Sequence, residues 1–207
     1  SELFSIQLQN RQQQGRDGVW LDLPTTTEQV QAALRQIGIS SDNPQGLFIS
    51  GYFAEEEKRF AIPYNMVLAS NVDELNFLAS RLETLSTGER AELNAALQAP
   101  QSELFSIGRI TDFPENVDYY VHLPDVHGPA QLGDYYLNRS GMVDMPDEWK
   151  GGIDTAQFGR YVAQQEQGAF TQYGYLVKSG DAWQKVHEGQ PVPEEYRVLS
   201  FPAPEVL

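Results

Sequence analysis

Acidic side chains are spread along nearly the whole chain, and this distribution most restricts what the chain can form. The 207 residues include 29 Asp and Glu against 14 Lys and Arg, a formal net charge of −15. Like charges in such excess repel one another in a compact state, so the excess calls for a functional reason. Hydrophobic residues still make up 41% of the chain, which is enough for packed cores and excludes an acidic disordered tail.

The same charge restricts the possible partners. Phosphate binding depends on clusters of Lys and Arg, and the sequence has none, so we expect no direct binding to nucleic acid. The expected partner is instead a basic protein surface. The commonest large basic surfaces in a cell are those built to hold DNA.

Two absences in the sequence narrow the class of protein. The chain has no cysteine, so it has no disulfide, thiolate metal site or thiol nucleophile, which fits a cytoplasmic protein. No apolar run approaches the roughly 18 residues of a membrane span, so no membrane partner is expected.

The pattern of hydrophobic residues predicts an α+β fold of three small domains. Residues 1–62 are expected to form an α/β domain. Apolar residues alternate over 4–8 and 19–23 as in strands, and Thr25 with Glu28 forms a capping-box pattern that opens a helix. Beyond residue 62, apolar residues recur at a different spacing.

Residues 63–103 are expected to form a short helical domain. Apolar residues recur there at helical spacing, and Ser86 with Glu89 forms a second capping-box pattern. Residues 104–207 are then expected to form a second α/β domain with mixed strands and helices.

The C-terminal domain has its own start and stop signals. Pro129 suits the first position of one helix, and Asp154 is a good N-cap for another. Strands are predicted by the segments that alternate or are rich in β-formers, namely 117–123, 173–178, 182–187 and 195–199. We expect the last three of these to pair as a meander within the third domain.

The sequence offers little support for catalysis. It contains no Gly-x-Ser-x-Gly elbow, phosphate-binding glycine loop or His-Glu-x-x-His helix. The spacing of His122 and His127 fits no recurrent zinc site, so we interpret both as solvated loop residues. Adjacent carboxylates such as Asp147 and Glu148 do not face each other on a helix, which favours solvated charge over acid–base chemistry. We therefore expect no enzyme activity, no cofactor and no metal.

Carboxylates at helical spacing suggest a use for the charge. Side chains three or four residues apart on a helix lie roughly 5–6 Å apart, close to the separation of neighbouring phosphates on a DNA strand. Glu89 and Glu92 have this spacing, as do Asp144, Asp147 and Glu148, although a loop is an alternative for the second group. A rigid fold can present such a pattern and lose little further conformational entropy when it binds a partner. The alternative interpretation is that a net-negative surface serves only solubility.

Several segments resemble, in the same order, the ArdA family of antirestriction proteins. Residues 18–24 are similar to the family's Gly-x-Trp-hydrophobic segment, and residues 47–52 to its Phe-Ile-x-Asp-Tyr strand, with Gly51 in place of the usual Asp. Residues 132–136, Leu-Gly-Asp-Tyr-Tyr, resemble the antirestriction region, and residues 153–160 resemble the signature Ile-Asp-Tyr-Glu-Ala-Tyr-Gly-Arg.

This resemblance, over roughly residues 2–176, implies a fold, a partner and a set of functional residues. It implies an elongated homodimer, with three small domains per chain, that mimics B-form DNA in the groove of Type I restriction–modification enzymes and carries out no catalysis. The carboxylates expected to stand in for phosphates are Asp73, Glu74, Glu83, Glu89, Glu92, Asp112, Glu115, Asp118, Asp125, Asp134, Asp144, Asp147, Glu148, Asp154 and Glu166. The antirestriction-like motif comprises Leu132, Gly133, Asp134, Tyr135 and Tyr136.

Two alternatives remain open at this point. The first is an acidic adaptor or regulator that binds another basic DNA-binding protein. The second is an ordinary protein from a salt-loving host, since only four lysines accompany the many acids. A halophilic fold should unfold at low salt, whereas a mimic should stay folded and lose affinity for its partner as salt rises.

Overall fold

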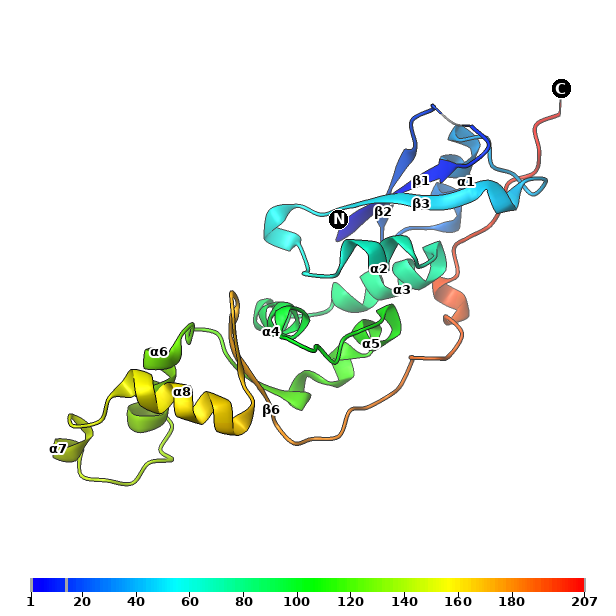
Figure 1. The fold of residues 1–207 in the computed structure, drawn as a ribbon. Coiled ribbons are helices and arrows are strands. Elements are labelled where there is room, and N and C mark those ends of the chain that lie inside the picture. Colours follow the sequence, from blue (N-terminus) through cyan, green and yellow to red (C-terminus); the bar gives the residue numbers. More distant parts are fainter. Residues whose placement is uncertain (1, 14, 207) are drawn as a thin grey trace. The chain divides into compact units, whose positions relative to one another are not determined.

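The chain has a mixed α+β fold with two small antiparallel sheets and several short helices, as the computed structural model shows (Figure 1). The structure describes residues 2–13 and 15–206. The predicted α+β class is confirmed. The three-domain arrangement, with divisions after residues 62 and 103, remains a prediction.

Contacts within the described residues group the chain into two compact units. Unit 1 comprises residues 2–85, 105–114 and 185–206. Unit 2 comprises residues 86–104 and 115–184. Each unit therefore draws on segments that are far apart in the sequence.

The sheet of unit 1 has the strand order β2-β1-β3 and is antiparallel throughout. Its strands are β1 (Phe4–Asn10), β2 (Val19–Leu23) and β3 (Leu47–Phe53). Alternation along β1 directs Phe4, Ile6 and Leu8 into the core, each no more than 2% exposed. Ile6 pairs with Leu21 on β2, so the predicted alternating strands are confirmed.

Helix α1 (Thr27–Gln36) begins one residue later than its predicted capping box. The hydroxyl of Thr26, not of Thr25, accepts the backbone N–H of Gln29 at 3.3 Å. The N–H of Thr25 is donated instead to the side-chain oxygen of Asn76, at 2.8 Å. This tertiary hydrogen bond holds Thr25 outside the helix, which explains why the local prediction was off by one residue.

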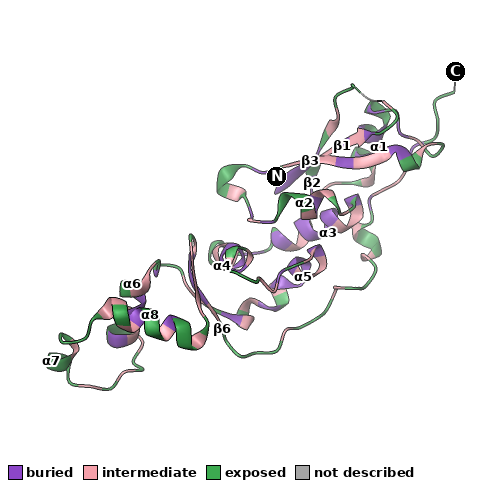
Figure 2. Ribbon diagram, viewed as in Figure 1, coloured by how far each residue is buried: buried purple, intermediate pink, exposed green. Residues whose placement is uncertain are grey.

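The remaining helices of unit 1 supply most of its core. They are α2 (Tyr64–Leu68), α3 (Val72–Leu82) and α5 (Ile107–Thr111), joined by 3-10 turns at Pro44–Gly46, Glu56–Lys58, Phe113–Glu115 and Glu194–Tyr196. Leu75, Leu78 and Leu82 recur on one side of α3 and are completely buried. Figure 2 shows buried residues along this helix.

Unit 2 combines helix α4 (Thr87–Gln98) with a sheet of order β4-β6-β5. The predicted capping box of α4 is confirmed: Glu89 N–H donates to the Ser86 hydroxyl at 3.2 Å, and Ser86 N–H donates to the Glu89 carboxylate at 2.8 Å. The strands are β4 (Tyr120–Leu123), β5 (Ala169–Thr171) and β6 (Gly174–Lys178). The first is shorter than predicted, because residues Val117–Tyr119 form a 3-10 turn.

The helices that follow β4 agree with their predicted start signals. Pro129 occupies the first turn of α6 (Pro129–Asp134), which continues into a π-helical turn over Tyr135–Arg139. The short helix α7 (Asp147–Lys150) comes next. Asp154 caps α8 (Thr155–Glu166), its carboxylate accepting the N–H groups of Ala156 and Gln157 at 3.1 Å.

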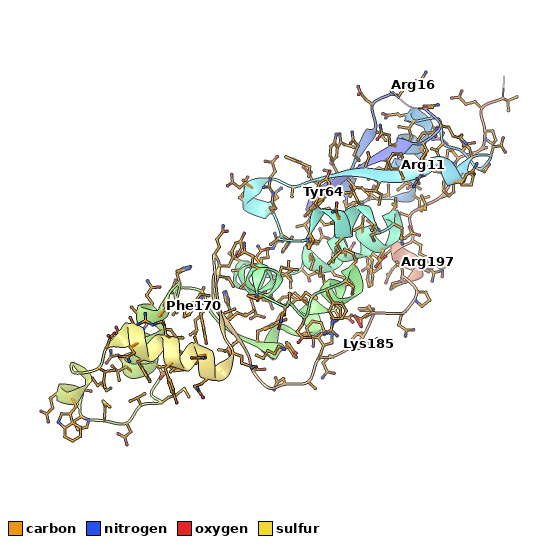
Figure 3. The ribbon with its side chains drawn as sticks, in the orientation of Figure 1. Arg11, Arg16, Tyr64, Phe170, Lys185 and Arg197 are labelled. Atoms are coloured by element: carbon orange, nitrogen blue, oxygen red, sulfur yellow. The ribbon has the colours of Figure 1, made fainter. Side chains whose placement is uncertain are left out.

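The predicted strand at 173–178 is confirmed as β6, but those at 182–187 and 195–199 are wrong, as is the meander that the three were expected to form. Within the described residues the latter two segments have no strand, and residues 185–206 belong to unit 1. Figure 3 labels Lys185 and Arg197 on this extended tail. Several of its backbone N–H groups donate to side chains of unit 1 instead of to a neighbouring strand.

Two carboxylates anchor the tail. Asp112, completely buried, accepts the backbone N–H groups of Val186, His187 and Glu188 at 2.7–3.1 Å. Asp73 accepts those of Val198 and Leu199, both at 2.8 Å.

An aromatic contact adds to the anchorage of the tail. The ring of Phe77 on α3 lies 4.9 Å from those of both His187 and Tyr196, and Asn76 donates to the carbonyl of Tyr196 at 3.0 Å. The tail is thus an integral part of unit 1.

Replacing Asp112 by alanine should lower the free energy of unfolding by about 3 kcal/mol or more, because three backbone donors would lose their acceptor. Urea denaturation of the wild type and the variant measures this difference. Asp42→Ala removes an exposed carboxylate from the same unit and should change stability by less than about 0.5 kcal/mol. Equal stability of both variants would contradict the anchoring role.

Candidate partner-binding site

Helices α6 and α8 of unit 2 cross at two glycines. A Cβ atom on Gly133 would lie 1.9 Å from the carbonyl oxygen of Thr155, and one on Gly159 would lie 1.7 Å from that of Pro129. Atoms cannot approach so closely, so any side chain at either position would force the helices apart. The glycine of the antirestriction-like motif is therefore needed for backbone packing.

The rest of the motif divides into core and surface positions. Leu132 is completely buried in a cluster with Val126, Ala163 and Tyr175. Tyr135 and Tyr136 are half-buried and pack against this cluster, as does Phe170, which Figure 3 labels.

Asp134 alone among the five motif residues is exposed. Its carboxylate accepts a hydrogen bond from the side chain of Asn138 at 2.8 Å, and the guanidinium of Arg139 lies 3.9 Å away. Within the described residues, the motif thus acts mainly as a scaffold that presents one carboxylate.

Glu166, at the end of α8, binds two tyrosine hydroxyls. Tyr175 donates to it at 2.5 Å and Tyr136 at 2.9 Å. Burial, and then the hydrogen bond to Glu166, raises the pKa of both tyrosines far above the usual range, so they remain donors at all physiological pH values. Glu166 was predicted to face a partner, but its oxygens are engaged inside unit 2.

Many of the other predicted carboxylates of unit 2 are exposed. Those on its surface are Glu115, Asp118, Asp125, Asp134, Asp144, Asp147, Glu148 and Asp154. Unit 2 as a whole has 13 Asp and Glu against 5 Lys and Arg. Of these cations, Lys150 lies 3.4 Å from Asp147. The result is a strongly acidic surface on a unit whose interior is fixed by close packing.

Other predicted carboxylates have structural roles in unit 1. Asp112 and Asp73 hold the C-terminal tail, and Asp112 is too deeply buried to reach a partner. Glu74 accepts hydrogen bonds from Ser70 and Asn71 at 3.1 and 3.3 Å. Glu83 is exposed. The sequence could not separate these roles, because it does not show which backbone donors the tail brings close.

Glu92 also differs from expectation. Burial, reinforced by the charges of Asp118 and Glu89, raises the pKa of its carboxyl to about 8, and its Oε2 atom has no hydrogen-bond partner among the described residues. At neutral pH this group is mainly uncharged. Glu89 caps α4, so the Glu89–Glu92 pair does not form the predicted phosphate-like pair of charges. Asp144 lies outside any helix, so its spacing to Asp147 is not helical either.

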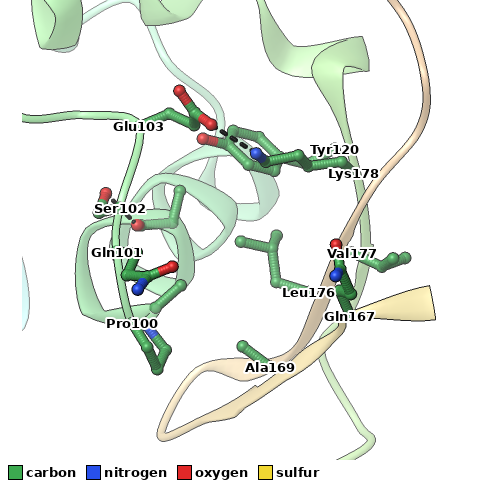
Figure 4. A pocket seen from close by; sticks show the side chains of 12 residues that line it. Pro100, Gln101, Ser102, Glu103, Tyr120, Gln167, Ala169, Leu176, Val177 and Lys178 are labelled. Carbon is green, nitrogen blue, oxygen red and sulfur yellow. Dashed lines mark hydrogen bonds and ion pairs between the residues drawn. The ribbon is translucent and has the colours of Figure 1, made fainter. Parts of the chain in front are cut away.

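A shallow cavity of about 70 Å³ lies in unit 2, between the end of α4 and the sheet (Figure 4). Its lining includes the ion pair of Lys178 with Glu103, together with Tyr120 and Leu176. None of its lining residues is a histidine or a cysteine. Among its polar lining residues, the Ser102 hydroxyl donates to the carbonyl of Ala96 at 2.6 Å and the Lys178 ammonium pairs with Glu103.

The described part of the chain also bears on the predictions about metal, histidine and membrane sites. No group of three or more His, Cys, Asp or Glu side chains there is arranged to hold a metal ion. His122 is not in a loop as expected: it lies on β4, and its ring nitrogen Nε2 is 2.7 Å from the carbonyl oxygen of Tyr173. Among the helices that are described, none has the length and apolar character needed to cross a membrane.

The sequence did not reveal the particular contacts of Gly159 and Tyr175 or the exposure of Trp149. Gly159 has a recognisable signal, since a glycine inside a helical pattern costs about 1 kcal/mol relative to alanine and usually has a packing reason. Tyr175 has none, because its partner Glu166 is on another element. Trp149 is 65% exposed, which hydrophobicity alone would not predict.

The chain is similar in sequence to a known protein family. A family model described as antirestriction protein (ArdA) matches residues 14–177, which is more than half of the chain. A search of curated proteins found no match. The matched region contains the crossing of α6 and α8 and ends before the C-terminal tail.

Replacing Gly159 by alanine should lower the stability of unit 2 by about 2 kcal/mol or more, because the new methyl group would clash with the backbone of α6. Thermal denaturation followed by circular dichroism measures the change. Gly151→Ala is the matched control: a Cβ atom at this position would meet no atom of a neighbouring element within 4 Å, so little change is expected. A Gly159→Ala variant as stable as the control would refute the close crossing.

Glu92→Gln should change how stability depends on pH. The raised pKa means that the folded state holds a proton that the unfolded state releases near pH 4.5, so wild-type stability is fully present below that pH and falls as pH rises through about 8. The variant should lack this fall and be the more stable protein above pH 8.

Urea denaturation at pH 5 and pH 8.5 tests the role of Glu92. Glu148→Gln, at an exposed position, serves as the control and should differ from the wild type by less than about 0.5 kcal/mol at both values. Parallel pH profiles for the wild type and Glu92→Gln would rule out a protonated Glu92.

Proposed function

Because this chain belongs to the ArdA family of antirestriction proteins, we propose that it inhibits Type I restriction–modification enzymes by occupying their DNA-binding groove as a mimic of B-form DNA. The observation that carries this proposal is the set of exposed carboxylates on unit 2. The proposed inhibitor blocks cleavage, modification or both, without catalysis of its own.

The number of exposed carboxylates suits this role. Duplex DNA has one charge per roughly 1.7 Å of its axis, so the eight exposed carboxylates named above match about 14 Å of duplex. We propose that the protein acts as a homodimer, which would at least double this span. A partner groove lined with Lys and Arg would then face carboxylates over about 28 Å, somewhat less than one turn of duplex.

The scaffold under these carboxylates supports competition with DNA. Gly133 and Gly159 allow α6 and α8 to pack backbone to backbone, and Glu166 ties α8 to Tyr136 and Tyr175. Asp154 is fixed as a helix cap. Side chains that are already positioned lose little conformational entropy on binding, so more of the electrostatic attraction appears as affinity.

Neutralising the surface of unit 2 should weaken inhibition progressively. We expect any single Asp→Asn or Glu→Gln change among Asp118, Asp125, Asp134, Asp144 and Glu148 to be nearly silent. All five together should raise the concentration for half-inhibition by at least about tenfold, because several screened charge contacts are lost at once. DNA cleavage and methylation by a purified Type I enzyme provide the measurement, at several salt concentrations.

A matched control separates mimicry from net charge. Neutralising Asp17, Asp42, Glu55, Glu56 and Glu57, which are exposed on unit 1, removes the same number of charges. This variant should inhibit nearly as well as the wild type. Equal losses in both variants would point to non-specific charge. Abolition of inhibition by one substitution in a folded protein would contradict a distributed mimic, and a wild-type protein that binds another basic protein but no restriction enzyme would favour an adaptor.

A further inference from the structure

We propose that Trp149 makes a cation–π contact with a Lys or Arg side chain of the partner's DNA-binding groove, a contact that DNA phosphates cannot make. This inference rests on the proposed function and identifies one point of attachment within it. The contact lies in the acidic loop, which we define as residues 140–154, between the π-helical turn and α8.

Trp149 is unusually accessible for a large aromatic residue. It is 65% exposed, although tryptophan is on average among the more buried residue types. It lies on the short helix α7, which Figure 2 shows as exposed. Its backbone is fixed at both ends of the turn, since its N–H donates to the carbonyl of Pro146 at 2.9 Å and its carbonyl accepts the N–H of Gly152 at 3.0 Å. The indole is thus presented from an ordered turn.

The charges around Trp149 define the chemistry of a suitable partner. The acidic loop has four exposed carboxylates, those of Asp144, Asp147, Glu148 and Asp154. Its one cation within the loop, Lys150, lies 3.4 Å from Asp147 and has a side chain only 18% exposed. An approaching surface must therefore be basic to be attracted, and a wholly apolar partner would have to desolvate these carboxylates.

The same cationic side chains satisfy both the carboxylates and the ring. A DNA-binding groove holds duplex with Lys and Arg side chains. Tryptophan has the best ring face for attracting an ammonium or guanidinium group, and the attraction strengthens when the pair is desolvated. The exposed carboxylates of the acidic loop attract an arginine of the groove to this surface, where its guanidinium can stack on the indole of Trp149. Duplex DNA offers this arginine a phosphate but no exposed ring face, so the contact favours the inhibitor over DNA.

Three variants test the contact in the cleavage-inhibition assay with a purified Type I enzyme. Trp149→Ala should raise the half-inhibitory concentration about tenfold, within the roughly twofold to thirtyfold range of one cation–π contact. Trp149→Phe, which keeps a weaker ring face, should lie between this variant and the wild type. Met142→Ala is the matched control: it removes an apolar side chain that is 75% exposed in the same loop, and should change the value less than twofold.

The salt dependence of inhibition distinguishes the contribution of the Trp149 ring from that of the carboxylates. Trp149→Ala should leave the slope of inhibition against salt concentration unchanged, because no charge is removed. Asp147→Asn with Glu148→Gln should reduce that slope. A direct probe is octa-arginine peptide, which should quench tryptophan fluorescence in the wild type and much less in Trp149→Phe.

Each remaining outcome counts against the inference in a recognisable way. Full inhibition by Trp149→Ala, or equal losses in Trp149→Ala and Met142→Ala, would overturn the cation–π contact and leave the proposed function intact. Conversion of a sedimenting dimer to a monomer by Trp149→Ala would instead assign the loop to contact between copies of the chain. Absence of inhibition by the wild-type protein would overturn the proposed function and this inference together.

Discussion

The backbone contact between α6 and α8 fixes most of what unit 2 presents to solvent. Gly133 and Gly159 bring the two helices together without intervening side chains, and the hydroxyl groups of Tyr136 and Tyr175 then reach one carboxylate, Glu166. Because these contacts are internal, the scaffold does not depend for its stability on the exposed acids of the acidic loop, apart from Asp154, which caps α8. Like charges on that surface repel one another, and the packed crossing provides an opposing attraction that requires no cation.

Carboxylates in this chain therefore have two separate uses. Asp73 and Asp112 satisfy backbone donors within unit 1, and Glu166 satisfies hydroxyl donors within unit 2. Carboxylates such as Asp125 and Glu148 are exposed instead. An acidic composition does not reveal this division, because the same residue type, Asp or Glu, can be a buried hydrogen-bond acceptor or an exposed charge. Membership of the ArdA family accounts for an antirestriction role, and the exposed set supports the mimicry that we propose.

Features that depend on residues close in the sequence were mostly predicted correctly. Features that depend on distant residues were not. The capping box of Ser86 and Glu89 and the N-cap Asp154 were correct because every atom involved lies within three residues. The tail was wrongly predicted as strands, because its backbone donors pair with Asp112 from more than 70 residues away. Similarly, the raised pKa of Glu92 is caused by burial and by the charge of Asp118. The spacing of residues along a helix predicts neither of these. The assignment of residues 132–136 as the antirestriction-like motif stays a prediction, and the largely structural character of these residues follows from neighbours on α8.

The position of the tail has a practical consequence for fragments of this protein. A fragment ending at residue 177, where the family match stops, would lose Val186, His187 and Glu188, whose backbone N–H groups surround the carboxylate of Asp112. The carboxylate of Asp112 would then lack these three hydrogen-bond donors. Phe77 would become solvent-accessible on the side now shielded by His187 and Tyr196. Poor recovery of such a fragment would reflect misfolding of unit 1, even though every residue assigned to restriction-enzyme recognition were still present.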